Sequence, residues 1–342
     1  MNVSKLIDWY HQHKRRLPWR ETSDPYKIWL SEIILQQTQV TQGLPYYEKF
    51  IQKYPDIFHL ATASEQEILN LWQGLGYYSR ARNLHYTAKE LVNKHHGNFP
   101  DNYTDLLKLK GVGEYTAAAI ASFCYDEPKA VLDGNVYRVL SRVFGIDTPI
   151  NTTEGKKIFK KLAQEHLYFK DPATYNQAIM EFGALHCTPA APKCAGCPLS
   201  VECVAYQTGK VKELPVKLKK NKVKKRYLHY FIIKSYKALI IQKREGKGIW
   251  QNLYQLPLIE TAKPEMPSDQ QIEKLALMHN IELPVKAKLL AQKKHLLTHQ
   301  HLEIFFWKIS LPKKTPQMIS FAALKDYPMP IVIANFLDNN IL

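Results

Sequence analysis

Hydrophobic residues recur at helical spacing through most of the first 205 residues. Apolar side chains return every three or four positions, which is typical of amphipathic helices. Short turn signals, such as Ser23-Asp24-Pro25 and Asp171-Pro172, separate the periodic segments. We therefore expect residues 1–205 to be almost entirely helical. The predicted helices are Val3–His13, Ile28–Thr41, Pro45–Tyr54, Glu65–Leu71, Arg80–Lys94, Tyr103–Lys108, Tyr115–Tyr125, Asn135–Phe144, Thr153–Leu167 and Ala173–Leu185.

The pattern changes beyond residue 226, where β-branched and aromatic residues dominate several short segments. Such segments are typical of strands. The combination predicts an α+β domain over residues 227–342 with an antiparallel or mixed sheet. The predicted strands are Tyr227–Lys234, Lys237–Lys243, Leu253–Leu258 and His301–Leu311, and the predicted helices are Ser268–His279 and Phe321–Tyr327.

A basic segment lies between these two regions. Residues 209–226 contain nine basic side chains, one acidic residue (Glu213), Pro215 and almost no large apolar residue. This composition is typical of an extended, charged linker, which we place at residues 206–226.

Length and composition narrow the class of protein. A chain of 342 residues is long enough for two or more domains, and 45% hydrophobic residues exclude wholesale disorder. The net charge of +16 favours a polyanionic partner such as nucleic acid, although a solubilising surface remains an alternative. No apolar run approaches the ~18 residues of a membrane span, and the first residues contain no signal-peptide core. We expect a cytoplasmic, nucleoid-associated protein.

Four of the five cysteines are clustered with the spacing C-x6-C-x2-C-x5-C. In a reducing compartment, clustered cysteines bind metal more often than they form disulfides. Zinc and a [4Fe–4S] cluster are both compatible with four thiolates. A single close pair and a proline-rich connection favour the iron–sulfur cluster. The cluster cysteines are Cys187, Cys194, Cys197 and Cys203, whereas Cys124 lies in an apolar stretch and is interpreted as a buried structural thiol.

Two further segments contain candidate DNA contacts. Gly111-Val112-Gly113 precedes a predicted helix and could expose amide groups to a phosphate, although it could also be a plain turn between helices. The glycines, tyrosines and arginines of residues 73–82 suggest a loop that contacts nucleic acid by stacking, with a simple turn as the alternative.

Two carboxylates are candidates for acid–base chemistry. Glu32 has Ile28, Trp29 and Leu35 as its helical neighbours, so an apolar environment would favour its protonated form. Asp133 directly precedes a predicted helix, where an N-cap would hold it ionised. A protonated and an ionised carboxyl are the pattern used to cleave glycosidic bonds. The structural alternatives are a surface glutamate and a simple helix cap.

The order of these motifs resembles the endonuclease III superfamily and, within it, the MutY adenine DNA glycosylases. The resemblance is dense over residues 1–205 and weaker over 227–342. The motifs are LPWR (17–20), SEIILQQTQV (31–40), GLGYYSRARNL (74–84), GVGEYT (111–116), LDGNV (132–136) and the four cysteines.

The resemblance implies an all-α helix–hairpin–helix glycosylase core with an iron–sulfur cluster loop, followed by an α+β Nudix-like domain. The core would comprise a six-helix module at about residues 22–133 and a cluster module formed by 1–21 and 134–205. Residues 206–226 would be the linker, and residues 227–342 a recognition domain.

The activity implied is that of a monofunctional enzyme, acting as a monomer on double-stranded DNA, that excises adenine mispaired with 8-oxoguanine or guanine. The adenine would be flipped out of the helix. By resemblance, Glu32 protonates it, Asp133 stabilises an oxocarbenium or acetal intermediate, and Tyr115 and Asn135 line the sugar. One [4Fe–4S] cluster would be bound. The DNA contacts implied are Arg20, Gln37, Thr38, Tyr77, Gly111, Val112, Gly113, Thr298 and His299.

The tyrosine at position 115 helps to distinguish a monofunctional glycosylase from the alternative functions. Bifunctional relatives carry a lysine at this position that forms a Schiff base with the sugar, and tyrosine cannot form an imine. A bifunctional, endonuclease III-like glycosylase and lyase is therefore the less favoured enzyme. A non-enzymatic iron–sulfur DNA-binding protein is the other alternative, but it would need neither carboxylate.

The C-terminal domain lacks the acidic, arginine-containing helix of true Nudix hydrolases, because residues 260–282 contain no arginine and no paired glutamates. We interpret it as a recognition module. The Phe-Ser-His loop of the family corresponds best to Leu297-Thr298-His299, which differs at the first two positions.

Overall fold

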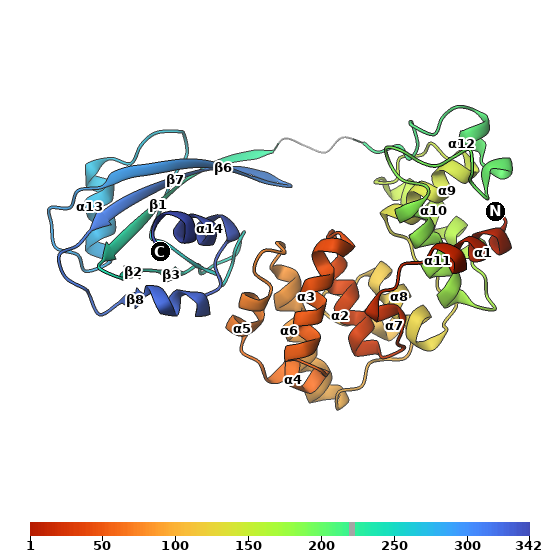
Figure 1. Ribbon diagram of the computed structural model, residues 1–342, viewed down its shortest axis with the longest axis horizontal. Helices are drawn as coiled ribbons and strands as arrows, with labels where there is room; N and C mark the ends of the chain where they lie inside the picture. The colour runs from red at the N-terminus through yellow and green to blue at the C-terminus, as the bar shows by residue number, and fades with distance from the viewer. Residues whose placement is uncertain (219–222) are drawn as a thin grey trace. The chain divides into compact units, whose positions relative to one another are not determined.

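The computed structural model describes residues 1–218 and 223–342, which fall into two compact units (Figure 1). The first unit contains residues 1–62 and 83–218, and the second contains residues 63–82 and 223–342. The centre of the predicted linker, residues 219–222, lies outside the described residues. Among the residues described, no helix combines the length and the apolar character needed to cross a membrane.

The first unit is helical, as predicted. Side-chain caps define the starts of many helices: Asn2, Asp24, Asp133 and Asp171 each accept a hydrogen bond from a backbone amide in the first turn. The elements are α1 (Val3–His13), η1 (Pro18–Arg20), α2 (Pro25–Leu35), α3 (Val40–Lys53), α4 (Ile57–Thr62), α6 (Ser79–His95, which begins in the second unit), α7 (Tyr103–Leu106), α8 (Glu114–Tyr125), α9 (Gly134–Phe144), α10 (Thr153–Glu165), α11 (Pro172–Leu185), η2 (Ser200–Glu202) and α12 (Val204–Gln207).

The N-terminal helix packs against helices that come much later in the chain. Helix α1 lies beside α11 (Figure 1), and α11 in turn packs against α9. Leu6 and Trp9 of α1 share one buried cluster with Val139 of α9 and Phe182 of α11. This packing joins the first residues of the chain to the segment that leads into the cysteines.

The predicted helix Ile28–Thr41 is wrong in its second half. Helix α2 ends at Leu35 and α3 starts at Val40, so the predicted start of the next helix at Pro45 is also wrong. Between them, Gln37 adopts a left-handed conformation with φ 55°. The apolar pattern stops here in the polar run Gln36-Gln37-Thr38-Gln39, but no glycine or proline marks the break.

The second unit is built around a mixed sheet, as predicted. The strand order is β6-β7-β1-β2-β8, with β5 also paired to β1, and β1 runs parallel to β7. The elements are α5 (Glu65–Leu71), β1 (Lys224–Ser235), β2 (Ala238–Ile240), β3 (Gln242–Lys243), β4 (Tyr254–Gln255), β5 (Leu258–Thr261), α13 (Asp269–Met278), β6 (Lys288–Leu297), β7 (Gln300–Ser310), β8 (Met318–Ser320), η3 (Phe321–Asp326) and α14 (Ile331–Asn340).

Helices cover both faces of this sheet. Helix α13 packs on the face that carries Phe231 of β1, whereas Phe336 of α14 stacks on Phe306 of β7 with ring centroids 3.8 Å apart. Phe306 in turn stacks with Tyr230, the neighbour of Phe231 that points to the opposite face. Burial on both faces explains the continuous apolar run in the middle of β1.

The predicted linker 206–226 is wrong at both ends. Before residue 219 the chain is bound to the first unit, because Arg142 donates to the carbonyl of Leu214 (3.0 Å) and Ile150 donates to that of Val216 (3.0 Å). After residue 222, Lys224–Arg226 already belong to strand β1. Hydrogen bonds to these carbonyls, and the pairing of β1 with its neighbours, give the two ends of this segment an ordered structure despite its charged composition.

Candidate active site

Glu32 lies on the buried side of α2. Its side chain is only 6% exposed and its helical neighbour Trp29 is fully buried, so the predicted apolar environment is confirmed. Burial raises the pKa of Glu32 to about 7. The hydrogen-bonding hydroxyl of Tyr115 lowers this pKa, and the nearby charge of Asp133 raises it. The carboxyl can therefore hold a proton near neutral pH.

Asp133 caps the start of α9, as predicted. One carboxylate oxygen, Oδ1, accepts from the amide of Val136 at 2.7 Å. The other, Oδ2, accepts from the side-chain amide of Asn135, also at 2.7 Å. Burial raises the pKa of Asp133, and these two hydrogen bonds oppose the rise. Because both oxygens accept hydrogen bonds, the group has the bonding pattern of an ionised carboxylate.

A chain of hydrogen bonds holds Asn135 in place. The Arg138 guanidinium donates to Asn135 Oδ1 at 2.8 Å and, from its Nε, to the carbonyl of Cys187 at 2.7 Å. Helix α11 comes close to this point through Gly183, where an added Cβ would lie 2.7 Å from the Cβ of Asn135. The orientation of Asp133 is thereby connected to the loop that carries the first cysteine.

Tyr115 brings α8 against Glu32. Gln36, just after α2, donates to the hydroxyl of Thr116 at 3.2 Å, which joins the end of α2 to the start of α8. The Tyr115 hydroxyl lies 3.4 Å from the sulfur of Met180 on α11, to which it can donate when it does not donate to Glu32. Burial and the charge of Glu32 raise the pKa of Tyr115 far above its usual range. Tyr115 is thus a neutral hydroxyl between the two carboxyl groups and α11.

Arg20, predicted to contact DNA, is engaged within the protein. Its guanidinium donates to both carboxylate oxygens of Glu181 (2.9 and 2.8 Å) and to Gln177 (3.0 Å). Arg15 also binds Glu181. Burial alone would raise the pKa of Glu181, but the two arginines outweigh it and lower the pKa to about 2. The structure gives Arg20 a structural role, and its contact with DNA stays a prediction.

The predicted hairpin lies between α7 and α8. Gly111 has φ +82°, and a Cβ there would lie 2.8 Å from the Cβ of Asn83, so both conformation and space require glycine. Gly113 is the N-cap of α8 and has no side chain to cap it, while Val112 is buried. In the part of the chain that the structure describes, no side chain caps the start of α8, which suits a phosphate.

The break between α2 and α3 exposes another pair of predicted contacts. Gln37 is exposed and Thr38 is half-buried in this loop. A left-handed conformation is uncommon for a residue other than glycine, and such residues gather at ligand-binding sites. Gln37 is one of these, with φ 55°.

Within the second unit, the structure joins two residues predicted from distant segments. Tyr77 is 44% exposed and left-handed, with φ 47°. Its hydroxyl hydrogen-bonds to the hydroxyl of Thr298, which occupies the turn between β6 and β7 together with the exposed His299. The sequence did not indicate this pairing, because the two residues are 221 positions apart.

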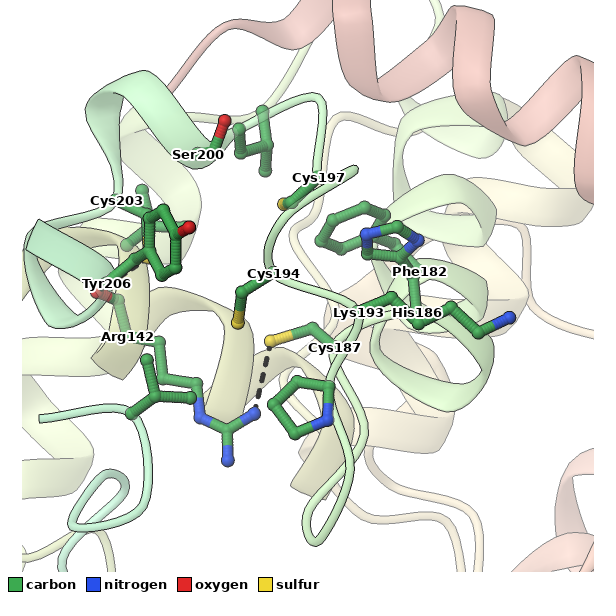
Figure 2. Close-up of a pocket in the computed structure, with 14 residues that line it drawn as sticks. Arg142, Phe182, His186, Cys187, Lys193, Cys194, Cys197, Ser200, Cys203 and Tyr206 are labelled. Carbon is green, nitrogen blue, oxygen red and sulfur yellow. Dashed lines mark hydrogen bonds between the residues drawn. The ribbon is translucent and has the colours of Figure 1, made fainter. Parts of the chain in front are cut away.

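The four cysteines line a single cavity in the first unit, shown in Figure 2. All four are free thiols, and each is partly buried. The Arg142 guanidinium donates to the sulfur of Cys187 at 3.4 Å (Figure 2). A cavity that is bordered by four thiols and closed on one side by a buried cation has the donor set for a metal centre with thiolate ligands.

The chemistry of the donor set leaves two kinds of centre. Zinc takes four thiolates at ~2.3 Å from one point, and an iron–sulfur cluster is likewise held by four cysteines. In the described parts of the chain, no three Cys, His, Asp or Glu side chains form a group that could hold a single ion.

Comparisons with known proteins agree with this architecture. Residues 30–165 match the profile of the HhH-GPD superfamily of base excision DNA repair proteins, and residues 229–339 match the NUDIX domain profile. An adenine DNA glycosylase of Buchnera aphidicola subspecies Schizaphis graminum is 34% identical over 97% of this chain and 96% of its own length. The chain belongs to the adenine DNA glycosylase family. A second relative, from Buchnera aphidicola subspecies Baizongia pistaciae, is 38% identical over 87% of this chain and 83% of its own length.

A solved structure described as a thermostable thymine-DNA glycosylase shares the fold of the helical unit. It is 31% identical, covers 60% of this chain and 95% of its own, and has a TM-score of 0.56. The sequence resemblance to this glycosylase superfamily is therefore confirmed, as are the helical core and the Nudix-like domain. The protein is an enzyme of base excision DNA repair.

Two residues that position the site were missed from the sequence. Glu181 and Arg138 are charged residues that the structure buries. Their helical neighbours include polar residues: Gln177 lies one turn before Glu181, and Arg138 has Asn135 and Arg142 on its own face. The apolar-face signal that singled out Glu32 therefore does not identify them.

Proposed function

We propose that this member of the adenine DNA glycosylase family hydrolyses the bond between adenine and deoxyribose where the adenine is mispaired with 8-oxoguanine or guanine in double-stranded DNA. The observation that carries the proposal is the pairing of Glu32, buried with a pKa of about 7, with Asp133, held by two donors at the start of α9. All these groups come from one chain, so we propose that it acts as a monomer.

The chemistry follows from the two carboxyl environments. The Glu32 carboxyl gives its proton to N7 of the flipped adenine, and the C1′–N9 bond breaks with its electron pair leaving on the base. The positive charge that develops on the sugar is stabilised by the carboxylate of Asp133, as an oxocarbenium ion or a transient acetal. Water then adds to C1′ and its proton returns to a carboxylate. Asn135 keeps Asp133 oriented throughout.

The opposite base would be contacted by exposed side chains from separate loops. Gln37 and Tyr77 are both left-handed residues, Thr38 follows Gln37, and Thr298 is hydrogen-bonded to Tyr77. 8-Oxoguanine has a donor at N7 and a carbonyl at C8, so a hydroxyl can accept from the first and donate to the second. We assign Thr298 to this role.

We further propose that the four cysteines hold one [4Fe–4S] cluster. When bound, the cluster supplies a rigid crosslink between α11, the cysteine loop and η2 rather than a step of base excision. The residues that would prepare its site are Cys187, Cys194, Cys197 and Cys203, with Arg142 donating to Cys187.

Labelled duplexes test the proposed function. The enzyme is incubated with A opposite 8-oxoguanine, A opposite T, or thymine glycol opposite A, and each product is examined with and without alkali. We expect a break at the adenine position of the first duplex only, and only after alkali. Cleavage of the thymine glycol strand, or binding without excision, would favour the two alternative functions.

The excision rate should depend on the protonation of Glu32. Burial raises its pKa to about 7, so the proton donor is present below this pH and is lost as the pH rises through it. The single-turnover rate should then fall about tenfold per pH unit above pH ~7. Rates measured from about pH 6 to about pH 9 at fixed salt check this. A rate that stays constant across this range would exclude Glu32 as the acid.

Borohydride should trap no stoichiometric covalent complex between the wild-type enzyme and DNA, because Tyr115 cannot form an imine. Tyr115→Lys places an amine between the two carboxyl groups and should gain trapping and strand cleavage. Tyr168→Lys, at an exposed tyrosine of the same unit, is the matched control. Efficient trapping by the wild type would show that another lysine attacks the sugar.

Thr298→Val removes the hydroxyl but keeps the shape, and Thr298→Ser keeps the hydroxyl. The first should weaken binding to the 8-oxoguanine duplex by roughly 0.5–3 kcal/mol, and the guanine duplex much less. The serine variant should resemble the wild type. Titrations at fixed salt measure both affinities. An equal loss on both duplexes would mean that the turn contacts only the backbone.

A further inference from the structure

A buried histidine lines the cysteine cavity, and its Nε2 has no hydrogen-bond partner among the residues that the structure describes. His186, immediately before Cys187, is 8% exposed and lines the same cavity as the four cysteines (Figure 2). Its Nε2 is buried and makes no hydrogen bond to the described residues. A buried polar atom without a partner costs free energy, so such an atom beside a cavity indicates a group that would bind there.

The ring is held in a fixed orientation by its neighbours. It stacks on Phe182 with centroids 4.9 Å apart and planes within 18°, and the edge of Trp9 packs against it at 5.7 Å. The backbone of His186 is fixed as well, because its carbonyl accepts from the amide of Lys193 (3.2 Å) inside the cysteine loop. The imidazole is therefore positioned rather than free to turn toward solvent.

We propose that His186 donates a hydrogen bond from its ring to a sulfur of the iron–sulfur cluster and so raises the reduction potential of that cluster. This inference rests on the proposed cluster. Four thiolates would give the cluster site negative charge, which favours the tautomer of His186 that carries its proton on Nε2, the nitrogen without a partner. Hydrogen bonds to the sulfurs stabilise the reduced, more negative state. Arg142, on the other side of the cavity, already makes such a contact with the sulfur of Cys187.

Three variants distinguish the effect of the hydrogen-bond donor of His186 from the effect of its aromatic ring. His186→Phe keeps an aromatic ring for stacking on Phe182 and removes the donor. His186→Gln removes the ring and keeps an N–H. His166→Phe is the matched control, because His166 also stacks on a phenylalanine (Phe144, 4.6 Å) and is not among the residues that line the cavity.

Iron and sulfide content is measured first on the full-length holoenzyme, and the midpoint potential is then measured by protein-film voltammetry at fixed pH. We expect His186→Phe to shift the redox equilibrium by up to about tenfold toward the oxidised state, a fall of up to about 59 mV for a one-electron couple. His186→Gln should stay closer to the wild type, and His166→Phe should not differ from it.

Two results would overturn the inference in distinguishable ways. A wild-type protein without iron and sulfide would contradict the cluster itself, and with it the role of His186. A loaded His186→Phe enzyme whose potential moves no more than that of His166→Phe would contradict His186 alone. If His186→Phe fails to assemble the cluster, His186→Leu replaces it as the variant without a donor, and potentials equal to those of His186→Gln would then refute the proposal.

Discussion

Replacing Glu32 by glutamine should slow adenine excision by about 10²–10⁴-fold in single turnover, the usual contribution of a general acid. The substitution removes the proton donor and almost no volume from a site that is only 6% exposed. Binding to the lesion duplex should remain close to that of the wild type. The loss should therefore lie in the chemical step and not in affinity.

Glu114→Gln is the control for this prediction. Glu114 lies at the start of α8, next to Tyr115, and its exposed carboxylate pairs with Lys160 at 2.9 Å. Exposed pairs contribute little, so this variant should excise adenine at nearly the wild-type rate. If Glu32→Gln stayed within about threefold of the wild type, its loss would be well below that of a general acid and another group would have to supply the proton.

Replacing Asp133 by asparagine should cost about 10²–10³-fold in the excision rate, as removal of an electrostatic contact to a developing charge does. The asparagine can still cap α9 through its carbonyl oxygen. It cannot supply the negative charge, and its amide would face the amide of Asn135 where the carboxylate accepted a hydrogen bond at 2.7 Å.

Asp171→Asn makes the same change at another helix cap. Asp171 accepts from the amide of Thr174 at 2.9 Å at the start of α11, outside the predicted chemistry. It should leave the rate near that of the wild type, with a small loss of stability. Equal losses for Asp133→Asn and Asp171→Asn would show that Asp133 acts only as a cap.

The sequence predicted the helical core well wherever caps and turn residues mark the helix ends. Val3–His13 agrees with α1, whose start is capped by Asn2, and Glu65–Leu71 agrees with α5 of the second unit, whose start is capped by Ser64. It missed the break after Leu35, because no glycine or proline marks it. It also missed strand β6 (Lys288–Leu297), an exposed edge strand rich in lysine whose side chains have no apolar alternation.

The grouping of residues 63–82 with the second unit had no local signal either. It depends on contacts between distant segments, such as Asn252 to Glu65 (2.6 Å) and Asn70 to the carbonyl of Lys325 (2.8 Å). A polar side chain that binds a remote backbone group looks like any surface residue in the sequence.

Within the candidate site, the sequence identified individual residues but not the interactions between them. A carboxyl on an apolar face and a carboxyl before a helix identify Glu32 and Asp133. Their mutual influence, and the engagement of Arg20 by Glu181, arise from the packing of α2, α8, α9 and α11. These relations depend on residues more than 100 positions apart, so they needed the structure.

Hydrolysis by Glu32 and Asp133 is tested most directly by a single-turnover reaction on a duplex with A opposite 8-oxoguanine, run in water enriched in oxygen-18 and followed by mass spectrometry. We expect one free adenine per turnover and an intact strand whose abasic sugar carries one oxygen-18 atom before exchange with solvent. A strand already cleaved by β-elimination, or a duplex bound without loss of adenine, would contradict hydrolysis by Glu32 and Asp133.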